Sequence, residues 1–222
     1  MRLPKAIKEE DARELMVFMR SKYKYFRETY KYLSAVDPQK EIMCISMNTL
    51  GAFAQEIPRF VDMRTIKLSD VDLECISTNA GGRPEKMNPA NQIIRHQFME
   101  VWIRLCFQKY VKNQYAGPDI NIQTGMSMLF QEFLQPTFKA YDSHEWRKKY
   151  LWVEEIDYVL KLALPSLKLV FKKFTAKKKS AGASNKMISV IEFVNMINEV
   201  NCFNERFGSN KLSVCFNLAM MT

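Results

Sequence analysis

The chain has 222 residues, of which 47% are apolar, and this composition indicates a packed globular protein rather than a disordered one. Seven glycines and eight prolines are too few for the many tight turns of an all-β fold. No apolar run is long enough to cross a bilayer, and the N-terminus lacks the apolar segment of a signal peptide. The sequence therefore predicts a soluble intracellular protein.

The first half of the chain predicts four helices. Apolar residues at helical spacing predict a long helix over residues 8–34, which the Asp-Pro pair at 37–38 ends. Ser46 is a predicted N-cap for a second helix that ends near Pro58, and acids at 70 and 72 favour the start of a third. The fourth pattern is the strongest, with a broad apolar stripe formed by Ile94, Phe98, Val101, Trp102, Leu105 and Cys106.

The second half continues in the same way. We expect a helix over residues 124–135, ending at or near Pro136. Asp142 and Glu145 are spaced as a capping box for a helix whose apolar face extends to residue 163, where Pro165 is expected to break the pattern. A helix over residues 167–174, a lysine-rich loop and a helix over 190–200 follow, and the tail contains one more apolar stretch.

These segments group into four helix–loop–helix pairs, at about 10–57, 69–113, 124–163 and 166–200. No strand alternation of useful length occurs, so we predict an all-α fold of tandem, degenerate EF-hand-like pairs. We expect two domains, at 1–115 and 116–222. The sequence leaves open whether the last helical unit is complete.

The predicted loops lack calcium ligands. An EF-hand loop needs oxygen ligands at positions 1, 3, 5 and 12 and a glycine at position 6. With Ile45 or Ile93 at the apolar eighth position, none of these four places holds a carboxylate, and with Ile188 there only Glu192 remains. Ser189 and Glu192 are also spaced as an N-cap and its partner, which explains the glutamate without an ion. We therefore predict no metal and no cofactor.

The net charge of +9 is concentrated in one segment. Residues 161–186 contain eight lysines and no acid, and without them the net charge is +1. The segment is either a solvated helix face with a loop or a contact surface for a polyanion or an acidic protein. Because arginine is absent, sequence-specific nucleic-acid binding is disfavoured. The predicted contact residues are Lys168, Lys172, Lys173, Lys177, Lys178, Lys179 and Lys186.

Catalytic and redox chemistry have little support. There is no phosphate-binding loop, no nucleophile elbow and no zinc-protease motif, and His96 with Glu100 is more typical of a surface pair than of a catalytic base. The cysteines are odd in number and form no C-x-x-C pair, so we expect buried, reduced thiols. These cysteines are Cys44, Cys75, Cys106, Cys202 and Cys215.

A set of motifs that spans most of the chain resembles an EF-hand-like family of large proteins in flagellated and ciliated protists. The motifs are at residues 67–73, 88–100, 141–147, 187–193 and 216–222. The resemblance implies paired EF-hand-like helices, a place in the ciliary axoneme and no catalytic residues.

The leading hypothesis is a non-enzymatic structural or adaptor protein of an axonemal or cytoskeletal assembly, with other proteins, tubulin among them, as partners. Hydrophobic clefts would hold partner helices, as EF-hand lobes do. The candidate cleft residues are Met43, Phe98, Trp102, Met128, Phe133 and Met196. A calcium-responsive regulator and a nonspecific nucleic-acid-binding protein are the two alternatives.

Overall fold

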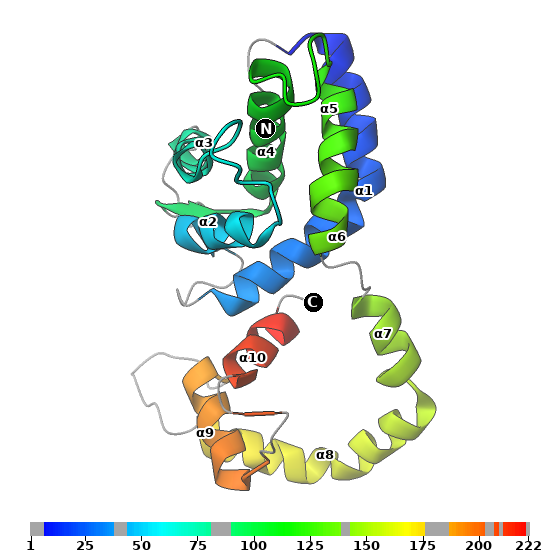
Figure 1. Cartoon of the computed structure of the whole chain (residues 1–222). Coiled ribbons are helices and arrows are strands. Elements are labelled where there is room, and N and C mark those ends of the chain that lie inside the picture. The colour runs from blue at the N-terminus through cyan, green and yellow to red at the C-terminus, as the bar shows by residue number, and fades with distance from the viewer. Residues whose placement is uncertain are drawn as a thin grey trace. The chain divides into compact units, whose positions relative to one another are not determined.

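A computed structural model describes residues 7–37, 44–80, 90–138, 143–175, 187–202, 207–208 and 211–220. The described chain is mostly helical, which confirms the predicted all-α class. It divides into two compact units, unit 1 (Met1–Tyr141) and unit 2 (Asp142–Thr222) (Figure 1).

Unit 1 contains most of the helices and both strands. Its elements are α1 (Glu9–Val36), β1 (Ile45–Ser46), α2 (Met47–Glu56), α3 (Leu68–Ala80), β2 (Gln92–Ile93), α4 (Arg95–Cys106), the π-helix η1 (Phe107–Lys112), α5 (Ile122–Leu129), the π-helix η2 (Phe130–Leu134) and α6 (Gln135–Thr137). Unit 2 contains α7 (Ser143–Tyr150), α8 (Glu154–Thr175), α9 (Val190–Val200) and α10 (Leu212–Met220).

Side-chain caps begin several helices where the sequence places them. Ser46 Oγ accepts a hydrogen bond from the Thr49 amide at 3.3 Å at the start of α2, as predicted. The predicted Ser189–Glu192 capping box is present at the start of α9, where the Glu192 carboxylate accepts from the Ser189 amide at 2.7 Å. Asp142 of the other predicted box lies outside the described residues.

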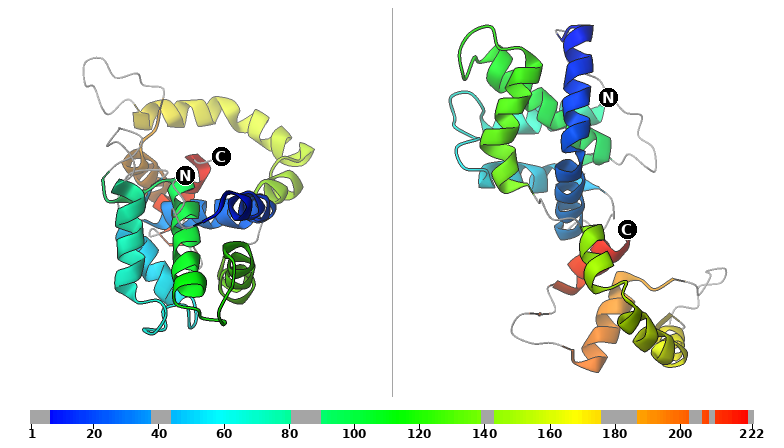
Figure 2. Two further views of the ribbon diagram at one scale, coloured as in Figure 1. Left: turned by 90° about the horizontal axis from the view of Figure 1, so that it is seen from above. Right: turned by 90° about the vertical axis from the view of Figure 1, so that its right-hand side faces the viewer.

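Two very short strands join two helix–strand–helix segments in unit 1. β1 pairs with β2 in antiparallel register, and Ile45 lies opposite Ile93. Figure 2 shows the helices of unit 1 from two further sides. Both isoleucine side chains are completely buried. The pairing therefore fixes α1 and α2 against α3 and α4 from within the core, although each strand is only two residues long.

Aromatic rings form the centre of unit 1. The Phe138 ring lies 5.1 Å from Phe26, 5.5 Å from Trp102 and 6.1 Å from Phe98, measured between ring centroids. Phe130 of η2 packs edge-on against Tyr25 of α1 at 5.2 Å. The segment from α5 to Phe138 is thus part of the core that α1 and α4 form.

Two expectations differ from the structure. The boundary between the two units falls between residues 141 and 142, whereas the sequence predicted it between 115 and 116. The expected pair at 124–163 is divided between the units, because the 122–138 segment packs on α1 and α4. Pro165 does not end a helix, since α8 continues through it. A proline inside a helix removes one hydrogen bond and costs about 3 kcal/mol. The exposure of Lys161, one turn earlier, allows water to satisfy the freed carbonyl.

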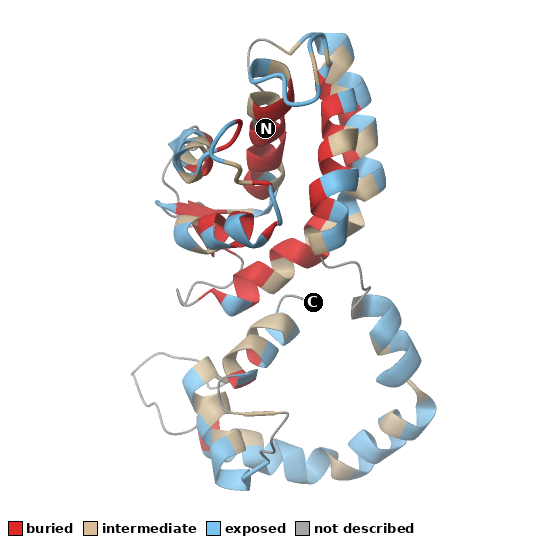
Figure 3. Cartoon of the chain, viewed as in Figure 1, coloured by how far each residue is buried: buried red, intermediate tan, exposed pale blue. Residues whose placement is uncertain are grey.

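Unit 2 has little core among its described residues. Its buried apolar side chains there are Phe174, Leu212 and Phe216. The Phe193 and Phe216 rings lie 5.3 Å apart, which joins α9 to α10, and Lys173 Nζ lies 2.8 Å from Glu199 Oε2, which joins α8 to α9. Most of the apolar surface of α8 is left uncovered within the unit (Figure 3).

Candidate functional site

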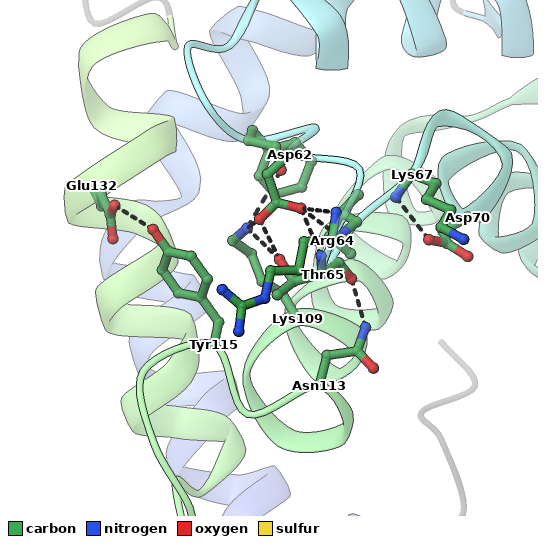
Figure 4. Close-up of polar contacts among 11 residues, drawn as sticks. Asp62, Arg64, Thr65, Lys67, Asp70, Lys109, Asn113, Tyr115 and Glu132 are labelled. Carbon is green, nitrogen blue, oxygen red and sulfur yellow. Dashed lines mark hydrogen bonds and ion pairs between the residues drawn. The ribbon is translucent and has the colours of Figure 1, made fainter.

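The connection between α2 and α3 is organised by one carboxylate, Asp62 (Figure 4). Its Oδ1 accepts hydrogen bonds from three successive backbone amides, those of Arg64 at 3.0 Å, Thr65 at 2.6 Å and Ile66 at 3.0 Å. Its Oδ2 accepts from the Thr65 hydroxyl. Met63, inside this turn, has a φ of 61°, a left-handed conformation that a side chain rarely adopts. The carboxylate holds this strained turn in place.

A buried lysine on η1 completes the cluster. The Lys109 side chain is fully buried, and its Nζ donates to Asp62 Oδ2 at 2.9 Å, to Thr65 Oγ1 at 2.8 Å and to the Phe60 carbonyl at 3.4 Å. The ammonium also lies 4.0 Å from the centroid of the Tyr115 ring, which favours a cation. An ammonium has three donor protons, so this lysine has none left for a substrate.

The electrostatics of Asp62 agree with a structural ion pair. Burial by itself raises the pKa of this carboxyl, but the hydrogen bonds from Thr65, from Lys109 and from the backbone outweigh it and hold the pKa well below its usual range. The group is therefore ionised at neutral pH and forms an ion pair with the buried ammonium. The cluster joins the α2–α3 connection to η1, and its chemistry is that of a clamp rather than of a catalytic centre.

The described parts of the first two predicted loops show how their exit helices begin. Asn91, at the sixth loop position, has a φ of 61°. Gln97, at the twelfth, is buried, and its Oε1 accepts from the Ile94 amide at 3.0 Å. Residues 38–43 and 81–89, which contain most of the other ligand positions, lie outside the described residues. Within the described ranges no three His, Cys, Asp or Glu side chains gather as a metal site.

The predicted cleft residues do not line an open cleft in the described part of unit 1. Phe98 and Trp102 are completely buried and Phe133 is 2% exposed. The Phe138 ring covers Phe98 and Trp102. This contact arises because the 122–138 segment, which the sequence placed in the second domain, packs on α1 and α4 of unit 1. Met128 is half-buried and packs against the core of unit 1, so these four residues are core residues in this conformation.

Two predicted cleft residues lie elsewhere. Met196 is half-buried on α9 of unit 2. Met43 lies outside the described residues.

Three of the predicted lysines lie on α8. Lys168 and Lys172 are exposed, while Lys173 forms the exposed ion pair with Glu199. Lys177, Lys178, Lys179 and Lys186 lie outside the described residues. The basic surface that the structure describes is therefore a helix face.

The sequence reasoning missed the exposed apolar surface of α8, because it assigned the apolar positions of this segment to a core. Leu160, Leu162, Leu167 and Leu169 are 50%, 66%, 47% and 69% exposed. Twelve of the 22 residues of α8 are apolar, more than one buried face of a surface helix requires. This excess was the signal available in the sequence.

A surface groove adjoins this helix at its N-terminal end. It has a volume of about 510 Å³ and is lined by Leu151, Trp152, Val153, Glu154, Asp157 and Leu160. Trp152 is 55% exposed, and its ring packs edge-on against His144 of α7 at 5.0 Å. The groove extends the apolar surface of α8 with an aromatic side chain.

Comparisons with protein-family profiles, curated protein sequences and solved structures give no significant match. Among the helices that the structure describes, none combines the length and the apolar character needed to cross a bilayer.

Proposed function

We propose that this chain is a non-enzymatic structural or adaptor protein of a ciliary axoneme or cytoskeletal assembly. In this proposal unit 1 is a closed scaffold and unit 2 carries the partner contact. The observation that supports it most directly is α8, which combines exposed leucines with exposed lysines. Large exposed apolar patches on proteins are typical of interaction surfaces.

The geometry of unit 1 supports its interpretation as a degenerate EF-hand-like pair. Ile45 and Ile93, which the loop alignment puts at equivalent eighth positions, lie opposite each other in the β1–β2 pair. Asn91 adopts the left-handed conformation at the sixth position, where a calcium loop has glycine. The exit helices α2 and α4 begin directly after the paired strands.

The same loops support a role without calcium. Thr49 and Gln97 occupy the twelfth positions, where a calcium loop has a bidentate glutamate. The Gln97 side-chain oxygen already accepts from a backbone amide. A neutral side chain used in this way stabilises the start of a helix and contributes no charge to a cation.

The buried polar cluster supports a non-enzymatic role. In an active site, ionisable groups need free lone pairs or protons directed at a substrate. Lys109 directs its protons at Asp62, Thr65 and a backbone carbonyl instead. Unit 1 thus uses its most unusual charged group to fix a loop.

The cytoskeletal placement rests on the resemblance and on the basic face of α8, since a tubulin lattice is an acidic surface. The test is co-sedimentation of the full chain with microtubules, together with localisation of the tagged chain in ciliated cells. Changing Lys168 and Lys172 to Gln should weaken co-sedimentation, whereas Lys112→Gln, on η1 of unit 1, should leave it unchanged. A diffuse cytosolic signal without any in cilia, or no co-sedimentation at low salt, would refute the placement.

A further inference from the structure

Most of the apolar residues of α8 lie on two sides of the helix, and the exposed Val159 lies between these sides on the narrower arc. The first strip follows spacings of four and three residues and consists of Ile156, Leu160, Ala163, Leu167, Val170 and Phe174. The second strip consists of Tyr158, Leu162 and Leu169, which are 63%, 66% and 69% exposed. At 3.6 residues per turn the centres of the two strips lie about 140° apart around the helix axis.

Lysines occupy the wider arc between the two strips. Lys161, Lys168 and Lys172 follow one another at spacings of seven and four residues and share one side of the helix. Lys161 contacts Asp157 one turn earlier, at 2.6 Å. From residue 158 to the end of α8 at Thr175 there is no acidic residue, so this stretch is uniformly basic.

A flat or one-sided partner would leave part of this helix uncovered. A membrane surface reaches one side of an amphipathic helix, and a second α8 packed against the first strip would likewise cover one side. Either arrangement would leave the second strip, the most exposed leucines of the helix, in water. A groove that encloses the helix covers both strips, and acidic rims on the groove complement the lysines.

We propose that α8 is the ligand helix of an acidic, helix-enclosing protein groove of the calcium-loaded EF-hand-lobe class. Such grooves bind basic amphipathic helices through apolar anchors at helical spacing, with charge complementarity around them. Leu160 and Leu167 are the anchors of the first strip, whereas Phe174 at its end is buried within unit 2, and Leu162 and Leu169 contact the opposite wall. The inference rests on the proposed adaptor function and names the chemistry of one partner.

The test uses the full chain and calmodulin as the probe, with binding measured by titration calorimetry in calcium and in a calcium chelator. We expect a 1:1 complex with a micromolar or lower Kd in calcium and at least tenfold weaker binding without it. Leu160→Asp and Leu167→Asp should each weaken binding at least tenfold, because a carboxylate replaces a buried anchor. The positions are about half exposed in the free chain, and circular dichroism checks that each variant still folds.

The second strip separates enclosure from one-sided docking. Leu162→Asp and Leu169→Asp should also weaken calmodulin binding at least tenfold. The matched control is Leu73→Asp, at an exposed leucine of α3 in unit 1, which should leave the affinity unchanged. Replacing Lys161, Lys168 and Lys172 with Gln should weaken binding and flatten its dependence on salt.

Several results would overturn the proposal. The full chain could fail to bind calmodulin, or the Leu162 and Leu169 variants could bind it as tightly as wild type. The chain could also bind anionic phosphatidylserine vesicles, or itself, in place of calmodulin. Microtubule co-sedimentation that persists without calmodulin binding would refute this inference and leave the proposed function standing. Calmodulin binding without any cytoskeletal association would do the reverse.

Discussion

Replacing Lys109 with Met tests whether the clamp between η1 and the α2–α3 connection stabilises unit 1. Methionine retains most of the side-chain volume but removes the ammonium, its three hydrogen bonds and its contact with the Tyr115 ring. Removing one partner of a buried ion pair costs about 3–5 kcal/mol, because the other charge stays buried and unpaired. Asp62 remains 22% exposed and keeps its bonds to three backbone amides, so we expect a smaller loss of about 2–4 kcal/mol.

The assay is urea unfolding of the full chain at neutral pH, followed by far-UV circular dichroism. Lys112→Met is the matched control, because Lys112 is an exposed lysine of the same π-helix, and its loss should stay within about 0.5 kcal/mol. A double-mutant cycle with Asp62→Asn should give a coupling energy above about 1 kcal/mol. If the Lys109 variant unfolds at the same urea concentration as wild type, the clamp contributes nothing and the reasoning is wrong.

Three further predictions concern pH, packing and thiol reactivity. Because the fold lowers the pKa of Asp62 from its ordinary 3.8, the contribution of Asp62 to stability is present above about pH 4 and is lost as pH falls below that. The unfolding free energy of Asp62→Asn should therefore fall less steeply with acid than that of wild type. Gly125→Ala should destabilise unit 1 by about 1–3 kcal/mol, since the added Cβ would lie 2.9 Å from the Tyr110 Cβ of η1. For Gly51→Ala the nearest atom to the added Cβ would be 3.6 Å away, so this change should stabilise α2 by about 0.5–1 kcal/mol in thermal unfolding. Of the five thiols, the exposed Cys202 and Cys215 should react rapidly with an aromatic disulfide reagent and the three buried ones only on unfolding; rapid reaction of more than two would contradict the burial.

Local signals in the sequence predicted the helix starts well. A capping serine needs only the amide three residues later, so Ser46 and Ser189 could be identified without any knowledge of the fold. Apolar residues at helical spacing likewise predicted α1 to within a few residues. These features depend on neighbours within one turn, which is the range over which sequence alone is informative.

Contacts between distant segments could not be predicted in this way. Lys109 and Asp62 lie 47 residues apart, and neither differs in sequence context from an ordinary surface residue. The packing of the 122–138 segment on α1 also depends on distant rings, such as Tyr25 against Phe130. The cleft was expected by analogy with EF-hand lobes, whereas in the structure the distant Phe138 ring covers Phe98 and Trp102.

The two units differ in how far they bury their apolar side chains, and this difference makes the stability of unit 2 the more dependent on a partner. Among its described residues, unit 1 buries most of its aromatic rings and the Lys109 ammonium. Over its described residues, unit 2 exposes the leucines of α8, and full burial of one such side chain contributes about 1.5–3 kcal/mol. A partner that covers several of them therefore stabilises unit 2 by mass action, in proportion to the logarithm of its concentration. Protease resistance of α8 should rise with added calmodulin while that of unit 1 stays constant, and equal protection of both units would contradict this division of roles.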